Sequence, residues 1–479
     1  MKVTIETKVK EYLNKKAALI EEINEKIWDY AEVGLEENKS VALYKKLLQA
    51  EDFHFENGIA GMPTAFTASY GSGKPVIGIL AEYDALPQLS QEAGLPKESP
   101  LEVGGHGHGC GHNSLGAGAF GATLAVKEYI KENGGSGTIK LFGCPSEEKD
   151  NGKTFMARDG YFNDVDCAFT WHPGDRNLTL GIPTLANISV VFSFEGKSSH
   201  AASAPHLGRS ALDSVELMNV GVNYLREHVI PEARLHYAYL DTGGQAPNVV
   251  QGSASVHYYI RAPKVEQVLA IFERVKDIAK GAALMSGTKY TYDIYSGLSD
   301  YLPNITLSKV LQTSLEEYGV TPYSEAEYEL AKSFYDTLTE QEKASALGQV
   351  TMMHGREEAA KMANKPLHNG ILPLFISNEA MPGSTDVGDV SQVTPTAQLS
   401  AATVCFGTPF HTWQMTAQGK TSTALKGVHT AAGAMATAAI KVLEDPTIAE
   451  EARQELIAET EGKYICPIPD DVSPHLPKS

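Results

Sequence analysis

The sequence predicts an α/β protein with a mixed, mostly parallel sheet flanked by helices and a small ferredoxin-like α+β domain inserted into the chain. Short strands that are apolar nearly throughout alternate with helices, and a β-α-β-β-α-β order follows in the middle of the chain. The 479 residues correspond to about three domain equivalents, enough for at least one large core. We expect a main domain made of residues 1–185 and 298–479, interrupted by an inserted domain at 186–297.

The first part of the chain alternates helices and strands. An apolar stripe predicts a helix over Ile20–Glu36, and a short apolar run predicts a strand at Val76–Ala81. A second helix is expected from Asn113, a suitable N-cap, to Asn133, where two glycines follow. Further strands are predicted at Thr138–Gly143 and Asp166–Trp171. Strands that are apolar on both faces and separated by helices are typical of a parallel sheet.

The middle of the chain reads as a self-contained unit. Its predicted strands are 188–195, 234–241, 253–261 and 289–295, and its predicted helices are 210–227 and 265–284. Helical and strand patterns resume afterwards, which indicates an insertion. Residues 324–361 are rich in Glu and Lys and predict solvated helix, and the Pro-rich tail from Pro467 is expected to be irregular.

Charge and cysteine content exclude several classes of protein. Forty basic and 59 acidic residues give 40 − 59 = −19, which disfavours binding to nucleic acid or an anionic membrane surface. No apolar run approaches the roughly 18 residues of a membrane span, and the N-terminus has no apolar signal core. Five irregularly spaced cysteines argue against a disulfide framework, so we expect a cytoplasmic protein with free thiols.

Carboxylates and imidazoles follow four apolar runs. Asp84 follows the run that ends at Ala81, the pair Glu147-Glu148 follows the one that ends at Gly143, and His172 follows Trp171. His411 comes soon after a fourth run, Ala401–Phe406. Because ligands bind at the carboxyl ends of parallel strands, we expect these side chains to meet at one rim of the sheet.

A glycine-rich loop, residues 104–113, adds three histidines and a thiol within seven residues. Imidazole and thiolate suit zinc and related metals, whereas added carboxylates also suit manganese. One face of the loop suffices for ligation, so Cys110 and His112 are the candidates and His106 and His108 are expected to lie outside the site. The competing interpretation is a flexible loop with exposed histidines.

The adjacent carboxylates Glu147 and Glu148 can point in different directions. One can bind a metal while the other removes and returns a proton of a water molecule, which is the chemistry of metal-assisted hydrolysis. Taken alone, such a pair is more often a pair of surface charges. Its position after a strand favours the catalytic interpretation.

Taken in order, these motifs resemble the co-catalytic metallopeptidase and amidohydrolase family of aminoacylase and glutamate carboxypeptidase type, and within it the p-aminobenzoyl-glutamate hydrolase branch. The resemblance extends over nearly the whole chain. It is carried by Asp84-Ala85-Leu86-Pro87, Gly109-Cys110-Gly111-His112-Asn113, Pro145-Ser146-Glu147-Glu148, His172-Pro173, Gly196-Lys197-Ser198-Ser199-His200, Ala246-Pro247-Asn248, Gly383-Ser384-Thr385-Asp386 and Gly407-Thr408-Pro409-Phe410-His411.

The resemblance implies two divalent metal ions, zinc or manganese, with one ligand shared. The implied ligands are Cys110, His112, Glu148, His172 and His411. Glu147 would be the general base and acid, and Asp84 would orient the ligands from behind. Asn113 departs from the aspartate of many relatives, which leaves a supporting contact at that position open.

The resemblance also assigns roles to the inserted domain. It would act as a lid and form a homodimer, in which His200 stabilises the oxyanion in the partner's active site. Asn248 and Arg261 would bind the substrate's carboxylate, Arg261 through its planar fork. Residues 324–361 go beyond the common family core and are expected to shape the pocket or the dimer.

The resulting hypothesis is a cytoplasmic metal-dependent amidohydrolase that cleaves N-acyl or N-aroyl amino acids of the p-aminobenzoyl-glutamate kind. The alternatives are a dipeptidase or exopeptidase of the same family and a catalytically silent binding protein. A second, related subunit is a further possible partner.

Overall fold

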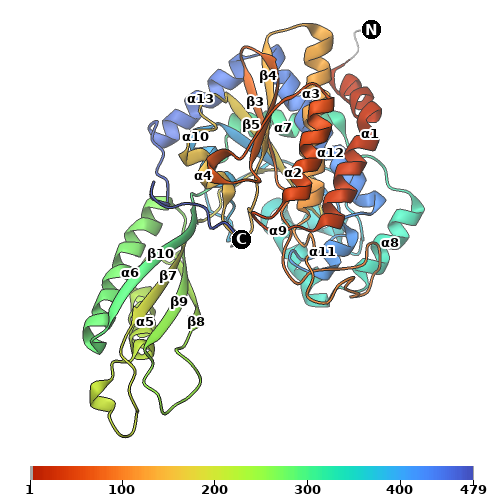
Figure 1. The fold of residues 1–479 in the computed structure, drawn as a ribbon. Helices are drawn as coiled ribbons and strands as arrows, with labels where there is room; N and C mark the ends of the chain where they lie inside the picture. Colours follow the sequence, from red (N-terminus) through yellow and green to blue (C-terminus); the bar gives the residue numbers. More distant parts are fainter. Residues whose placement is uncertain (1–3, 478–479) are drawn as a thin grey trace.

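The structure, a computed structural model, describes residues 4–477 and contains two sheets. An eight-stranded sheet lies between helices, and a four-stranded sheet projects away from it with two helices on one side (Figure 1). The larger sheet has the order β1-β2-β4-β3-β5-β12-β6-β11. Its strands are β1 (His54–Asn57), β2 (Phe66–Ser72), β3 (Val76–Ala81), β4 (Gly137–Gly143), β5 (Cys167–Gly174), β6 (Leu178–Gly181), β11 (Phe375–Ile376) and β12 (Thr396–Ala402).

The predicted mixed, mostly parallel sheet is confirmed at its centre. Strands β4, β3, β5 and β12 are neighbours and pair in parallel, whereas β1 and β2 and the β12–β6 pair are antiparallel. The carboxyl ends of the four central strands therefore lie at the same edge, which we call the carboxyl-end rim.

Both faces of this sheet are covered, which explains the uninterrupted apolar strands. In β3, Ile77 and Ile79 pack into one core and Val76 and Leu80 into the other. One face carries α1 (Ile5–Tyr30), α2 (Asn38–Ala50), α3 (His112–Asn133), α7 (Ile305–Tyr318), α12 (Ser422–Glu444) and α13 (Thr447–Thr460); the other carries α4 (Gly152–Arg158) and α10 (Val387–Val393).

Several element boundaries differ from the predictions. The first helix begins at Ile5 and ends at Tyr30, and α3 begins at His112 after an N-cap at Gly111. The fourth strand is Thr396–Ala402, so the prediction of Ala401–Phe406 was wrong. Residues 404–406 lie in a loop that is packed inside the protein, and each is at most 1% exposed. Their apolar side chains reflect this burial. Burial alone does not distinguish a strand from a packed loop.

The four-stranded sheet confirms the ferredoxin-like prediction. Its order is β10-β7-β9-β8 and all its pairs are antiparallel. The elements are β7 (Ala186–Glu195), α5 (Ala211–Leu225), β8 (Arg234–Asp241), β9 (Ser253–Ala262), α6 (Val265–Ser286) and β10 (Lys289–Leu298). We call these elements and their loops the lid; Figure 1 shows that it extends away from the larger sheet.

The acidic stretch 324–361 is helical as predicted, but it is not only a solvated surface. It forms α8 (Glu325–Tyr335) and α9 (Glu340–Met362), and the backbone of α9 breaks at Gly355, where φ is 84°. Phe334 and Val350 are fully buried. The remaining elements are α11 (Trp413–Gln418) and 3-10 turns at Ile59–Gly61, Pro205–Leu207 and Arg226–His228. Within residues 4–477, none of the helices combines the length and apolar character of a membrane span.

Candidate metal centre

Five segments that are distant in sequence meet at the carboxyl-end rim. Glu82 and Asp84 follow β3, the pair Glu147-Glu148 follows β4, and His172 lies near the end of β5. Cys110 lies in the loop before α3, and His112 is the first residue of α3. His411 lies between β12 and α11. The parallel pairing of the four central strands is the reason these segments converge.

The five predicted ligands come together in two groups that share one residue. The first contains Cys110, His112 and His172, and the second contains Cys110, Glu148 and His411. A third group joins His112 to Glu82 and Glu147. Within each group the donor atoms lie within 4.8 Å of one another, a spacing that suits coordination of a common ion. Cys110 thus has the position expected for a shared ligand.

Asp84 holds two of these residues from behind. Its Oδ1 lies 2.8 Å from His112 Nδ1, and its Oδ2 accepts a hydrogen bond of 3.0 Å from the Glu148 backbone N–H. His172 is oriented in a similar way, because its Nδ1 lies 2.8 Å from the Pro173 carbonyl oxygen. Such contacts leave the opposite ring nitrogen of each histidine for a metal.

Unusual backbone conformations position the ligand loops. Gly111 adopts a φ of 77° immediately before α3, a conformation that favours glycine. Ser146 and His411 adopt left-handed conformations with φ of 56° and 60°. The Ser146 turn is held by a hydrogen bond from its N–H to Glu37 Oε1 (2.9 Å), and the His411 N–H donates to the Gly109 carbonyl (2.8 Å). Two of the left-handed residues other than glycine, Ser146 and His411, thus belong to the loops that carry the predicted metal ligands.

The residues fit a pair of divalent cations. His112 Nε2 is buried and makes no hydrogen bond within the described chain, and Cys110 Sγ lies 3.4 Å from His172 Nε2. Burial and the nearby Glu148 raise the pKa of the Cys110 thiol well above its usual value. A bound cation would supply the positive charge that a thiolate needs at this position.

The two neighbouring glutamates have opposite electrostatic environments. Burial and the charges of Glu82 and Asp386 raise the pKa of Glu147 well above its usual value. Burial opposes ionisation of Glu148 too, but His411 and His112 outweigh it and lower its pKa to about 2. His411 Nε2 lies 3.2 Å from Glu148 Oε1. Glu148 is therefore the carboxylate suited to bind metal, and Glu147 the one suited to exchange a proton.

A buried triad of charged residues, Lys153, Glu82 and Asp386, lies next to the candidate metal ligands. Lys153 on α4 is fully buried, and its Nζ lies 2.7 Å from Glu82 Oε1 and 2.5 Å from Asp386 Oδ1. The other oxygen of Glu82 lies 3.2 Å from His112 Nε2. The triad thus connects the start of α10 to the predicted metal ligands.

Replacing Lys153 by alanine should lower the free energy of unfolding by about 3–5 kcal/mol, because two carboxylates would remain buried without their cation. Urea denaturation of the metal-free protein measures this change. Lys332→Ala is the control, because the ion pair of Lys332 with Asp336 is solvent-exposed and its loss should have little effect. Equal effects of the two substitutions would contradict the structural role of the triad.

A cavity of about 450 Å³ opens beside the predicted ligands. Part of its wall is formed by the acidic and imidazole side chains of the metal centre. The remaining wall is largely apolar and includes Leu178, Leu180, Met353, Met381 and Phe410. Gln349 and Met353 come from α9, so the stretch 324–361 contributes to the wall of this cavity.

The three predicted lid residues occupy different positions. His200 and Asn248 are exposed and do not line the cavity. They are close to each other, because His200 forms an antiparallel β-bridge with Val249, the residue after Asn248. His200 Nδ1 accepts hydrogen bonds from the N–H groups of Ala202 and Ser203, each 3.2 Å long. Arg261 reaches the cavity wall indirectly, because its Nη1 donates to Ser384 Oγ at 2.8 Å.

His106 and His108 lie outside the three groups of candidate ligands, as predicted, and Asn113 has a structural contact. His108 is buried and bonds to the Ile27 carbonyl oxygen at 2.9 Å, and burial lowers its pKa to about 3. His106 is exposed and does not line the cavity. Asn113 donates to Asn24 and to the Gly419 carbonyl, so it ties α3 to α1 rather than supporting a metal ligand.

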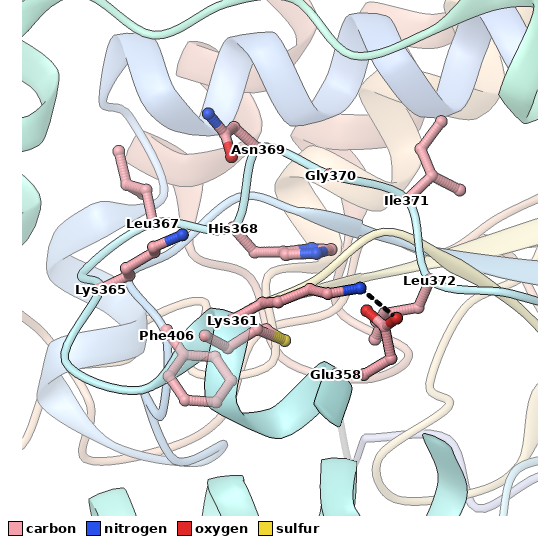
Figure 2. A pocket seen from close by; sticks show the side chains of 11 residues that line it. Glu358, Lys361, Lys365, Leu367, His368, Asn369, Gly370, Ile371, Leu372 and Phe406 are labelled. Carbon is pink, nitrogen blue, oxygen red and sulfur yellow. Dashed lines mark hydrogen bonds and ion pairs between the residues drawn. The ribbon is translucent and has the colours of Figure 1, made fainter. Parts of the chain in front are cut away.

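A second, smaller cavity of about 260 Å³ lies beside the C-terminal part of α9 (Figure 2). Figure 2 shows the ion pair between Glu358 and Lys361, with Lys365, His368 and Phe406 nearby. Burial lowers the pKa of His368 to about 4, and its Nδ1 accepts a hydrogen bond from the Asn177 N–H. This cavity contains none of the three groups of candidate metal ligands.

Sequence reasoning missed Glu82, Lys153 and Arg176. Glu82 could have been found, because it stands two residues before Asp84 at the same strand end. Lys153 carries no local signal, since a lysine in a short helix is usually exposed. Arg176, in the turn between β5 and β6, lines the cavity although nothing in its sequence neighbourhood marks it.

The chain is similar to several known proteins. The chain is 42% identical over 457 residues to a subunit of the p-aminobenzoyl-glutamate hydrolase of Escherichia coli (strain K12), which is 95% of each chain. It is 28% identical over 335 residues to the Xaa-Arg dipeptidase of Mus musculus, covering 66% of this chain and 72% of the relative.

The fold is shared with the Bacillus subtilis YXEP protein, a dinuclear metal binding peptidase from the M20 family. The TM-score is 0.55 at 15% identity, over 91% of this chain and 99% of that one. The model of peptidase family M20/M25/M40 matches residues 78–396. The stretch 324–361 lies within this match, and therefore within the family core, which corrects the expectation that it goes beyond it. The extent of this match, together with the relative of 42% identity, shows that the chain belongs to peptidase family M20/M25/M40.

Proposed function

We propose that the protein is a two-metal amidohydrolase that cleaves the amide bond of N-acyl or N-aroyl amino acids. The observation that carries this proposal is the convergence of five candidate ligands from separate segments, with Glu147 beside them at the wall of a cavity. Cys110, His112, Glu148, His172 and His411 would hold two divalent ions, zinc or manganese.

The residues have complementary roles in this reaction. When bound, the cations lower the pKa of a coordinated water and polarise the amide carbonyl. Glu147 takes the proton of the attacking water and returns it to the leaving amine, for which its raised pKa is suited. Asp84 keeps His112 and the Glu148 backbone in position.

The proposed substrate class is an aroyl amino acid similar to p-aminobenzoyl-glutamate. The apolar wall of the cavity suits an aromatic ring, and Arg261, fixed by Ser384, suits a carboxylate. The Escherichia coli relative, whose name specifies p-aminobenzoyl-glutamate, supports the same class. Because that relative is named as one subunit of its enzyme, a second, related subunit is part of the proposal's test.

We further propose that the main domain comprises residues 1–185 and 298–479 and that the lid comprises residues 186–297. We also propose that two copies of the chain form a homodimer through their lids. Strand β8 is an edge strand with exposed Tyr237, Tyr239 and Leu240, and neighbouring α5 exposes Val220 and Tyr224. His200 and Asn248 do not line the cavity of their own chain. In the dimer, His200 of the partner subunit would stabilise the tetrahedral oxyanion and Asn248 would bind the substrate's carboxylate.

The test combines metal analysis with a hydrolysis screen of the purified chain. We expect about two divalent ions per chain and hydrolysis of p-aminobenzoyl-glutamate that a chelator abolishes and added zinc or manganese restores. Light scattering measures the dimer, and addition of a second family member tests the need for another subunit. A metal-loaded protein without activity on acyl amino acids or dipeptides would favour the silent binding protein.

A dipeptidase is the second candidate, favoured by the similarity to the mouse Xaa-Arg dipeptidase. The two candidates differ in the group that they accept on the amino-terminal side of the scissile bond. Preference for a free amino group over a benzoyl group, compared with the same leaving amino acid, would decide for the dipeptidase.

A further inference from the structure

We infer that Arg176 is a specificity residue that binds a carboxylate of the substrate in the cavity beside the candidate metal ligands. This inference rests on the proposed amidohydrolase function and names a second recognition point within the same site. Nothing in the family resemblance assigns a role to this residue.

The guanidinium of Arg176 is held in one orientation by three neighbours. Its Nε donates to Asp175 Oδ1 at 2.6 Å, and its Nη2 donates to Gln349 Oε1 at 3.1 Å. The ring of Phe406 lies 5.9 Å from its Cζ. Asp175 is itself fixed, because its Oδ2 accepts a hydrogen bond of 2.9 Å from the Gly407 N–H. The fork is thus preorganised before a ligand binds.

One nitrogen of this fork lacks a partner. Within residues 4–477, Nη1 makes no hydrogen bond although it is shielded from solvent. A buried N–H without an acceptor is unfavourable, and more so in a charged group. Arg176 is one of the residues that line the cavity, and in the proposed complex an acceptor bound there supplies the missing bond.

The charges of the cavity favour an anion at this point. Among the described residues that line it, Arg176 is the only lysine or arginine, whereas four carboxylates, those of Glu82, Glu147, Glu148 and Asp175, line the same cavity. The chain also has a net charge of −19. A substrate carboxylate would therefore be repelled in most of this cavity, and Arg176 is where it gains a charge-assisted hydrogen bond.

The carboxylate can belong to the side chain of the amino acid or to the acyl group. The experiment compares two matched pairs of substrates, each an acid and its neutral amide: N-benzoyl-glutamate against N-benzoyl-glutamine, and N-(4-carboxybenzoyl)-alanine against N-(4-carbamoylbenzoyl)-alanine. We expect the wild-type enzyme to prefer the acid in one pair by about 10- to 100-fold in kcat/KM, and the preferred pair identifies the source.

Arg176→Met should bring that acid-to-amide ratio close to one, mainly through KM, while hydrolysis of the amide stays near the wild-type rate. A collapsed site would lose both substrates, so the ratio separates recognition from folding. Arg176→Lys, which keeps the charge but not the fork, should retain part of the preference.

Lys365→Met is the matched control. Lys365 lines the neighbouring cavity of Figure 2, so this variant removes one positive charge near α9 without touching the fork. Its acid-to-amide ratio should equal that of the wild type. An equal loss in Lys365→Met would assign the effect to overall charge and overturn the inference.

The wild-type comparison tests the inference even where Arg176→Met does not fold. No preference for the acid in either pair, or an unchanged ratio in a folded Arg176→Met, overturns the role of Arg176 and leaves the amidohydrolase function standing. If no acyl amino acid is hydrolysed, the proposed function fails instead, and calorimetric binding of the same acid and amide pairs still decides whether Arg176 recognises a carboxylate.

Discussion

Replacing Glu147 by glutamine should lower kcat for acyl-amino-acid hydrolysis by about 10²- to 10⁴-fold while KM and metal content stay close to those of the wild type. Glutamine has nearly the shape of glutamate but cannot accept and return a proton. Glu147 lies at the cavity wall, outside both groups that contain Cys110. Steady-state kinetics and metal analysis of the same preparation measure the two effects.

Glu357→Gln is the control for this experiment. Its side chain is 91% exposed on α9, so the substitution removes one carboxylate without affecting the cavity. Loss of metal along with turnover in Glu147→Gln would show that Glu147 is a ligand, as its proximity to His112 and Glu82 also permits. Hydrolysis at the wild-type rate would exclude it as the general base.

Cys110→Ala should bind less metal than a variant that lacks a ligand found in only one candidate group, because Cys110 belongs to two of the three groups. We expect metal content to fall below one ion per chain and kcat/KM to fall by more than about a hundredfold, since even contacts behind a ligand are worth that much. His411→Ala, which removes a ligand from one group only, should keep one ion. Elemental analysis after dialysis distinguishes these results.

The affinity for metal should also rise with pH through Cys110. Burial and Glu148 raise the pKa of the thiol in the metal-free site, so the proton is present at neutral pH and must leave when a cation binds. Affinity therefore increases as the pH rises towards that pKa and decreases as it falls, and this dependence should be weaker in Cys110→Ala. Cys405→Ala removes a buried thiol that is hydrogen-bonded to Thr408. Its metal affinity should depend on pH as that of the wild type does.

Four of the predicted ligands stand in recognisable local patterns, Cys110 and His112 in a glycine-rich loop and Glu148 and His172 after apolar runs, and the family resemblance assigned them as ligands. His411 follows a buried loop instead of a strand. An apolar strand such as Val76–Ala81 has a defined carboxyl end, and Asp84 stands three residues after it. Glycines around Cys110 mark a loop in which the backbone turns sharply. The β-α-β-β-α-β order of the lid was equally readable, since its strands alternate and its helices have apolar stripes.

Other features depend on contacts between segments that are far apart in the chain. Val404–Phe406 resemble a strand in sequence, but the loop that they form is buried by packing. The contribution of Gln349 to the cavity carries no local signal either, whereas the break in α9 at Gly355 falls on a glycine, which favours its φ of 84°. The surroundings of Gln349 are formed only when α9 packs near the turn between β5 and β6, where it contacts Arg176.

The sequence alone therefore determined the α/β class, the order of elements in the lid and, through the family resemblance, the candidate ligands and the chemistry that they can support. Only the tertiary structure decided which charged residues surround the candidate ligands and line the cavity. Lys153 and Asp386 are separated by 233 residues, and Arg176 and Gln349 by 173. Hydrophobic periodicity is a local property of the chain, whereas the pairing of buried charges is selected by desolvation once distant segments have packed together.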